Sequence, residues 1–240
     1  MTKWIIFDMD NTLIDTEVLY TNAMSEFADV MARLGFPRDR VLARQAEVDQ
    51  SLLKEMGYST DRFAKSFEIT LREFVSLIQC QLAPGHVEAL ALEVKKIAMN
   101  VFERKSVEYE YTESVVRDCM KAGYKVGIIT AGERWVQTRR FDNLSVRNLF
   151  QDCWVVLRKT KEVFNDFARK HDVNPQESWM IGDSISSDIE PAVAAGFNAI
   201  HLDTSNWVAR DRGFKLPVGV VTVPNLSHIR EIILGVPNNG

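Results

Sequence analysis

Cysteine is scarce in this sequence, which limits the chemistry that sulfur could support. The chain has three cysteines, Cys80, Cys119 and Cys153, and no two have the spacing of a metal clip or a redox pair. We therefore expect buried, reduced thiols, which suit a reducing compartment. Histidine is equally sparse and shows no ligand spacing, so we expect structural or surface positions for all four: His86, His171, His201 and His228.

Long hydrophobic runs and an excess of one charge are also missing. No stretch approaches the roughly 18 apolar residues that cross a bilayer, and the apolar run at residues 4–7 is far too short for a signal peptide. The 29 basic and 33 acidic residues leave a net charge of −4, which provides no strong basic field for nucleic acid or anionic lipid. We expect a cytoplasmic protein without nucleic-acid or membrane partners.

The composition is that of an ordinary globular protein. Hydrophobic residues make up 46% of the 240 residues and charged residues 26%, which excludes a disordered chain, a collagen-like repeat and a disulfide scaffold. This length can bury a core without disulfides or metals, and it suggests one large domain or two small ones.

Between about Thr16 and Glu108 the sequence predicts helices almost throughout. Apolar residues recur there at steps of three and four, which is the period of one helix face. Breaks are expected at Gly35-Phe36-Pro37, Gly57-Tyr58-Ser59 and Pro84-Gly85. The periodic residues are Met24, Phe27, Ala28, Met31 and Leu34; Phe63, Phe67, Ile69, Leu71, Phe74, Leu77 and Ile78; and Leu90, Val94, Ile97, Ala98 and Val101.

The rest of the chain alternates short apolar strands with helical patterns, which is typical of a mainly parallel sheet covered on both faces. We therefore expect an α/β fold, a Rossmann-like doubly wound parallel sheet formed by residues 1–15 and 109–240. An all-helical domain, residues 16–108, would be inserted after the first strand. The predicted strands are 4–8, 126–130, 153–157, 179–182, 199–202 and 218–223, and the predicted helices are 113–122, 162–170 and 189–195. The tail at 237–240 is expected to fray.

Two aspartates follow the first predicted strand. Asp8 and Asp10 are two residues apart, a spacing that points both side chains to the same side of extended backbone. Chemistry in an open parallel sheet lies at the carboxyl ends of the strands. Because neighbouring carboxylates repel each other, this pair favours a hard divalent cation such as Mg²⁺ or a shared proton. A turn with a helix cap is the plainer interpretation of an isolated pair.

The pair is not isolated, because three further patterns follow in order. Asp8-Met9-Asp10-Asn11-Thr12-Leu13 resembles the first signature of the haloacid dehalogenase superfamily, with Asn11 where Gly is common. The strand 126–130, which ends in Thr130, resembles the second signature. Gly182-Asp183, followed by Asp188 and then by Pro191-Ala192 and Ala195-Gly196, resembles the fourth. The helical insertion stands where this family carries its cap domain.

The third signature of the family is a lysine at the start of a helix, usually followed by proline. This chain has Arg158-Lys159-Thr160-Lys161 and no proline. Lys159-Thr160 aligns best with the family's Lys-Pro, while Lys161 and Arg158 stay open as alternatives.

The resemblance implies phosphoryl transfer through an aspartyl-phosphate. Asp8 would be the nucleophile, and Asp10 would protonate the leaving alcohol and then activate water. Thr130 would hydrogen-bond a phosphoryl oxygen, and Lys159 would stabilise the developing negative charge.

The resemblance also implies a Mg²⁺ site. Its ligands would be Asp8, the backbone carbonyl of Asp10, and Asp183, while Asp188 would act either through a water molecule or as an acceptor that orients the site.

A Mg²⁺-dependent phosphatase for a small phosphorylated metabolite is the leading interpretation, in a monomer or homodimer. The dehalogenases of the family lack the second aspartate, so Asp10 favours a phosphatase. A phosphosugar mutase and a non-catalytic binding protein on the same fold are the alternatives.

Basic and aromatic residues near Thr130 admit two interpretations. Arg134, Arg139 and Arg140 could meet an anionic substrate, but we expect a solvated helix face. Trp135 and Trp207 could line a pocket, but we expect packing in the core or against a partner.

Overall fold

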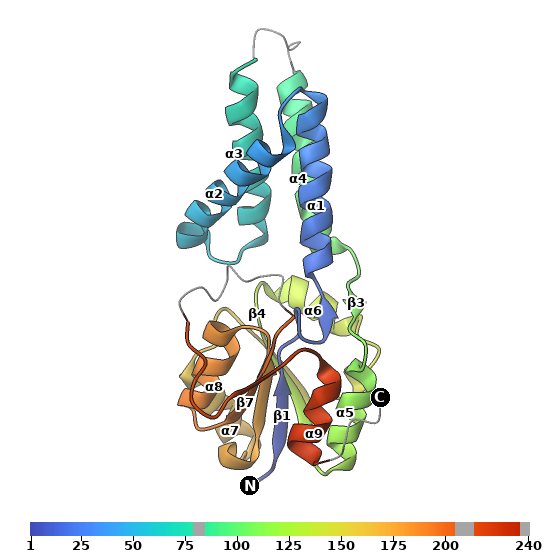
Figure 1. The fold of residues 1–240 in the computed structure, drawn as a ribbon, viewed down its shortest axis with the longest axis vertical. Helices are drawn as coiled ribbons and strands as arrows, with labels where there is room; N and C mark the ends of the chain where they lie inside the picture. The colour runs from blue at the N-terminus through green and yellow to red at the C-terminus, as the bar shows by residue number, and fades with distance from the viewer. Residues whose placement is uncertain (79–84, 205–213, 236–240) are drawn as a thin grey trace. The chain divides into compact units, whose positions relative to one another are not determined.

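The computed structural model describes residues 1–78, 85–204 and 214–235. Cys80, Trp207 and the tail at 237–240, on which the sequence makes predictions, lie outside these ranges. The chain divides into two compact units (Figure 1). The α/β unit comprises residues 1–16 and 105–240, and the helical unit comprises residues 17–104.

A six-stranded sheet forms the centre of the α/β unit. Its strand order is β5-β4-β1-β6-β7-β8, and every neighbouring pair is parallel. The strands are β1 (Trp4–Phe7), β4 (Lys125–Ala131), β5 (Asp152–Val156), β6 (Trp179–Gly182), β7 (Asn198–Leu202) and β8 (Val221–Val223). The predicted α/β class is therefore confirmed, with the first strand near the middle of the sheet.

Helices cover both faces of this sheet, because its strands carry apolar side chains on both sides. Ile5 and Phe7 belong to the core under α5 (Thr112–Lys121) and α9 (Ile229–Leu234). Trp4 and Ile6 belong to the opposite core, with Phe164 and Ala192. Those two residues come from α7 (Lys161–His171) and α8 (Glu190–Ala194) (Figure 1). The alternation along one four-residue strand thus produces a doubly wound architecture.

Four helices form the described part of the helical unit: α1 (Glu17–Arg33), α2 (Arg38–Met56), α3 (Thr60–Ser76) and α4 (His86–Glu103). Gly35-Phe36-Pro37 separates α1 from α2, Gly57-Tyr58-Ser59 separates α2 from α3, and Gly85 stands directly before α4, whereas Pro84 lies outside the described residues. Phe27 of α1 stacks on Phe67 of α3 with ring centroids 4.4 Å apart. Most of the predicted periodic residues are buried or half-buried in this unit, but Leu77, at the end of α3, is 74% exposed. No helix of the described residues is long and apolar enough to cross a membrane.

A short antiparallel pair, which the sequence did not predict, joins β2 (Ile14–Asp15) to β3 (Val107–Glu108). It holds together the two points at which the chain leaves and re-enters the α/β unit. Two residues a strand are too few to produce an alternating pattern, so sequence periodicity gives no signal for it.

Asp152, at the start of β5, connects the sheet to the end of α7. Its carboxylate accepts hydrogen bonds from Trp154 Nε1 at 2.8 Å and from Lys170 Nζ at 2.7 Å, and it contacts His171 Nε2 at 2.9 Å. Burial opposes ionisation, but these partners outweigh it and lower the pKa of Asp152 to about 2. The ionised carboxylate therefore stabilises the folded state.

We predict that Asp152→Asn lowers the free energy of unfolding by about 1–2 kcal/mol at pH 7, since the group is partly exposed and its ion pair is screened. Because the folded pKa is depressed, the wild-type advantage is complete above about pH 4 and disappears as the pH falls through about 2. Urea unfolding at several pH values measures it. Asp166→Asn, which alters an exposed ion pair on α7, is the control. An equal loss in both variants would contradict the prediction.

Candidate active site

The sheet brings the predicted acidic residues together at the carboxyl ends of its strands. Asp8 directly follows β1, and Asp183 directly follows its neighbour β6. One carboxylate oxygen from each of Asp8, Asp183 and Asp188 lies within 4.8 Å of the others. Three carboxylates at this separation, with hard oxygen donors, suit a cation such as Mg²⁺.

The turn after β1 depends on Asn11, the residue that stands where the family commonly has glycine. Asn11 has a φ of +57°, a conformation that asparagine tolerates better than most residues. Its side-chain oxygen accepts hydrogen bonds from the backbone N–H of Thr16 at 3.1 Å and from the Thr16 hydroxyl at 2.9 Å. The turn is thereby closed just before α1 begins.

Lys159 is the basic residue that the structure brings to the acids. Its ammonium group contacts both Asp8 Oδ1 and Asp188 Oδ1, and all three side chains are buried. Thr160 caps α7 by accepting a hydrogen bond from the backbone N–H of Val163, which places Lys159 just before the helix. The two alternatives for the third signature, Arg158 and Lys161, are exposed.

Burial and charge act in opposite directions at this cluster. Desolvation, together with the charges of Asp188 and Asp10, raises the pKa of Asp8 to about 7, although Lys159 opposes the rise. Burial alone would lower the pKa of Lys159, but Asp188 and Asp8 outweigh it, and the pKa lies above its ordinary value. The ammonium group therefore stays charged, and it only partly neutralises the acids around it.

Gly182 is required by the position of Asp188. A Cβ on Gly182 would lie 2.4 Å from Asp188 Cγ, a separation at which the carboxyl group has to move. Asp188 Oδ2, the oxygen that Lys159 does not contact, accepts a hydrogen bond from the backbone N–H of Ser184 at 3.0 Å. The Gly-Asp pattern with a later aspartate thus has a packing reason: the glycine leaves room for the carboxylate behind the strand end.

Three buried polar atoms near these strand ends have no hydrogen-bond partner among the described residues. They are Asp10 Oδ1, Thr12 Oγ1 and Thr130 Oγ1. Thr130 lies in β4 beside β1, and Thr12 belongs to the turn after Asp8. Since a buried hydroxyl without a partner costs free energy, two such hydroxyls suit an oxygen-rich ligand that accepts their protons.

Arg140 corrects one prediction from the sequence. Arg134 and Arg139 of α6 (Arg134–Asp142) are exposed, as a solvated helix face requires. Arg140, however, is only 8% exposed, and its Nη1 lies 2.6 Å from Asp10 Oδ2. Gln137, one helical turn earlier, donates to the same oxygen at 2.8 Å.

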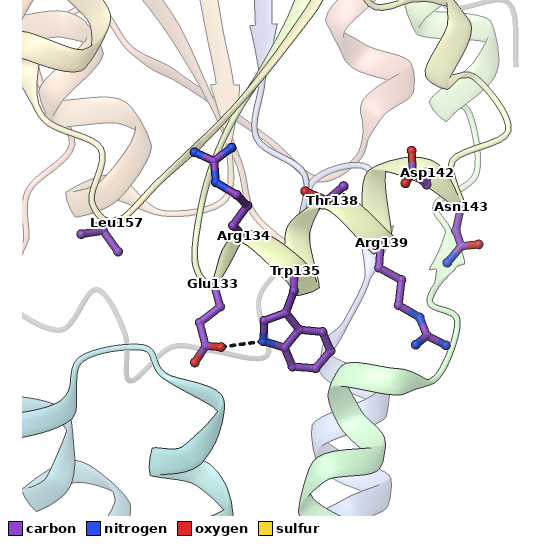
Figure 2. Close-up of a pocket in the computed structure, with 8 residues that line it drawn as sticks. All are labelled: Glu133, Arg134, Trp135, Thr138, Arg139, Asp142, Asn143 and Leu157. Carbon is purple, nitrogen blue, oxygen red and sulfur yellow. Dashed lines mark hydrogen bonds between the residues drawn. The ribbon is translucent and has the colours of Figure 1, made fainter.

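The structure contradicts the expectation that Trp135 packs in the core. Trp135 is 44% exposed and lines an open depression along the outer face of α6, near the exposed Leu157 (Figure 2). Its indole N–H donates to Glu133 at 2.7 Å. None of the three clustered aspartates, Asp8, Asp183 and Asp188, lines this depression.

The described thiols, Cys119 and Cys153, and the histidines His171 and His201 have structural surroundings. Cys119 is buried and Cys153 half-buried, and burial raises the pKa of each thiol to about 12. His171 packs against the Trp4 ring with centroids 4.7 Å apart. His201 lies 3.1 Å from the backbone carbonyl of Asp183, so it supports the turn that carries an acid of the cluster.

We predict that Lys159→Met lowers the free energy of unfolding by about 3 kcal/mol in EDTA, because it leaves two buried carboxylates without their cation. Lys161→Met is the matched control, since Lys161 is two residues away and exposed. Urea unfolding compares the two variants. Equal stabilities would show that Lys159 does not neutralise the buried acids.

Comparisons with known proteins agree with the motifs. The sequence profile of the haloacid dehalogenase-like hydrolases matches residues 5–202. A curated relative, the glyceraldehyde 3-phosphate phosphatase of Pyrococcus furiosus, is 25% identical over 224 residues, which cover 89% of this chain and 85% of that protein.

Solved structures share the fold. A haloacid dehalogenase-like hydrolase from Xanthomonas campestris superposes with a TM-score of 0.72 at 20% identity, covering 98% of this chain and 91% of the other. A magnesium-bound hydrolase of this type from Bacillus subtilis has a TM-score of 0.66 at 16% identity, covering 97% and 99%.

Proposed function

Because this chain belongs to the haloacid dehalogenase-like hydrolases, we propose that it is a Mg²⁺-dependent phosphatase acting on a small phosphorylated metabolite. One observation carries the proposal. The buried carboxylate of Asp8 lies against the ammonium group of Lys159, at strand ends where two threonine hydroxyls are buried without hydrogen-bond partners among the described residues. A phosphoryl group is the ligand whose oxygens these hydroxyls and this cation would bind.

The donor set fits a divalent cation. Asp8, Asp183 and the backbone carbonyl of Asp10 would hold Mg²⁺, and the clustering of the Asp8, Asp183 and Asp188 carboxylates supports this assignment. Both oxygens of Asp188 already have partners, Lys159 and the N–H of Ser184, so we assign Asp188 the orienting role. A bound Mg²⁺ would neutralise charge between the nucleophile and the phosphate.

The net charge of the site also favours a bound divalent cation. Asp8, Asp10, Asp183 and Asp188 contribute four negative charges when ionised, against the positive charges of Lys159 and Arg140. The difference is two negative charges with Asp10 ionised, and one with Asp10 protonated as the first proton transfer requires; a divalent cation would offset either. Desolvation is the main cause of the raised pKa of Asp8, and the negative charges of Asp188 and Asp10 add to it.

In the first half of the reaction, a carboxylate oxygen of Asp8 attacks phosphorus as the ester P–O bond breaks. Asp10 gives a proton to the departing oxygen, so the product leaves as an alcohol. The Thr130 hydroxyl donates to a phosphoryl oxygen, and Lys159 stabilises the negative charge shared by that group and Asp8. The products are the free alcohol and a phosphorylated Asp8.

In the second half, Asp10 removes a proton from water, and the water oxygen attacks phosphorus. The bond between phosphorus and the Asp8 oxygen breaks, which releases inorganic phosphate and restores both aspartates. The presence of Asp10 supports a phosphatase over a dehalogenase, because an alkoxide needs a proton to leave and a halide does not.

We predict that the wild-type protein releases phosphate from one or a few small phosphate esters, with glyceraldehyde 3-phosphate tested first because the relative from Pyrococcus furiosus carries that name. Asp8→Asn should lower the rate of phosphate release at least about 10³-fold, since it removes the nucleophile. EDTA should abolish it reversibly. Inorganic phosphate is measured with and without Mg²⁺ over a panel of metabolites.

Asp166→Asn, an exposed substitution on α7, is the control for this assay. Activity that survives in Asp8→Asn would overturn the assignment of the nucleophile. Interconversion of phosphate esters without phosphate release would instead identify a mutase.

A further inference from the structure

We propose that Arg140 and Gln137 are positioning residues that hold Asp10 by one oxygen and aim the other at the leaving group of the substrate. The proposal rests on the proposed phosphatase function and adds two residues to it. Both lie on the inner face of α6, three residues apart, and both reach the same carboxylate atom.

Only one of the two carboxylate oxygens of Asp10 has hydrogen-bond partners among the described residues. Arg140 Nη1 and Gln137 Nε2 converge on Oδ2, at 2.6 Å and 2.8 Å. The second oxygen, Oδ1, is buried and has no hydrogen-bond partner among the described residues. Arginine frequently binds both oxygens of a carboxylate. Here the pairing fixes the carboxylate and leaves one oxygen for a further partner.

Gln137 is itself held in place by the turn between β4 and α6. Its amide N–H group also donates to the backbone carbonyl of Ala131 at 2.9 Å. Gly132, with a φ of +147°, leaves room for this side chain, because a Cβ there would lie 2.9 Å from Gln137 Nε2. The N–H of Gly132 donates to Val156 of β5 at 3.0 Å, so the turn is tied to the sheet. Through Gln137 and this turn, the position of Asp10 is fixed relative to β4 and β5.

The chemical consequence concerns the first proton transfer. As the ester P–O bond breaks, the proton on Asp10 Oδ1 moves to the departing oxygen, and the electrons of the O–H bond remain on Asp10. This transfer needs the donor oxygen within hydrogen-bond reach of the leaving group. A carboxylate free to rotate would present that oxygen only part of the time. Arg140 and Gln137 would remove this freedom before the substrate arrives.

The test compares two substrates that differ in their need for the proton. An alkyl phosphate, whose leaving group is a strong base, needs it, whereas 2,4-dinitrophenyl phosphate loses a stable phenolate without help. Their kcat/KM values report the formation of the phosphorylated enzyme and leave its later hydrolysis out.

For Arg140→Met we expect kcat/KM for the alkyl phosphate to fall about 100-fold, and that for the dinitrophenyl ester to fall less than about 3-fold. Arg140→Lys should recover part of the loss. Gln137→Leu, which preserves the volume, should show the same selectivity with a loss of about 10-fold.

Arg139→Met is the matched control, because Arg139 is adjacent on α6 but points to the outer face (Figure 2). Arg139→Met should leave kcat/KM unchanged for both esters. Equal losses for the two esters in Arg140→Met and Gln137→Leu would mean a purely structural role and overturn the proposal, as would unchanged kcat/KM for the alkyl ester. Failure of the phosphatase assignment itself would appear differently, as a wild-type protein inactive on both esters or an active Asp8→Asn.

Discussion

The burial of several carboxylates at one edge of a parallel sheet is the constraint on which the candidate site depends. Asp8, Asp183 and Asp188 come together because β1 and β6 are neighbours that end on the same side. Such acids repel each other in a medium of low dielectric, so each must have a cation or a hydrogen-bond donor. Lys159 of the segment before α7 pairs with Asp8 and Asp188, the N–H of Ser184 donates to Asp188, and Arg140 of α6 pairs with the nearby Asp10.

Most of the fold could be predicted from the sequence. The strands are short apolar runs bounded by turn residues, and all six appear in the sheet. The resemblance to the haloacid dehalogenase superfamily, based on Asp8, Asp10, Thr130 and the Gly182-Asp183 pattern, is confirmed by the family match over residues 5–202. These motifs can be recognised in the sequence because each places a polar residue, or a glycine that the packing needs, directly at the end of an apolar strand.

Arg140 and Gln137 could not be predicted, for a physical reason. Helix α6 has nine residues and only Val136 as a buried apolar position, so no apolar stripe indicates its inner face. Arg139 and Arg140 are adjacent in sequence but about 100° apart around the helix, since an α-helix has about 3.6 residues per turn. One therefore faces solvent and the other Asp10. The choice of Lys159 over Lys161 has the same origin, because it depends on where the cap of α7 falls.

The strand order also has a consequence for how the protein emerges from the ribosome. The helical unit, residues 17–104, is one continuous stretch and can fold as soon as it is synthesised. Strand β1 precedes it but lies between β4 and β6, which are made more than a hundred residues later. Its four buried residues therefore wait without their sheet neighbours while the helical unit forms. The segment that carries Asp8 is therefore made before the helical unit but is enclosed in the sheet only after it.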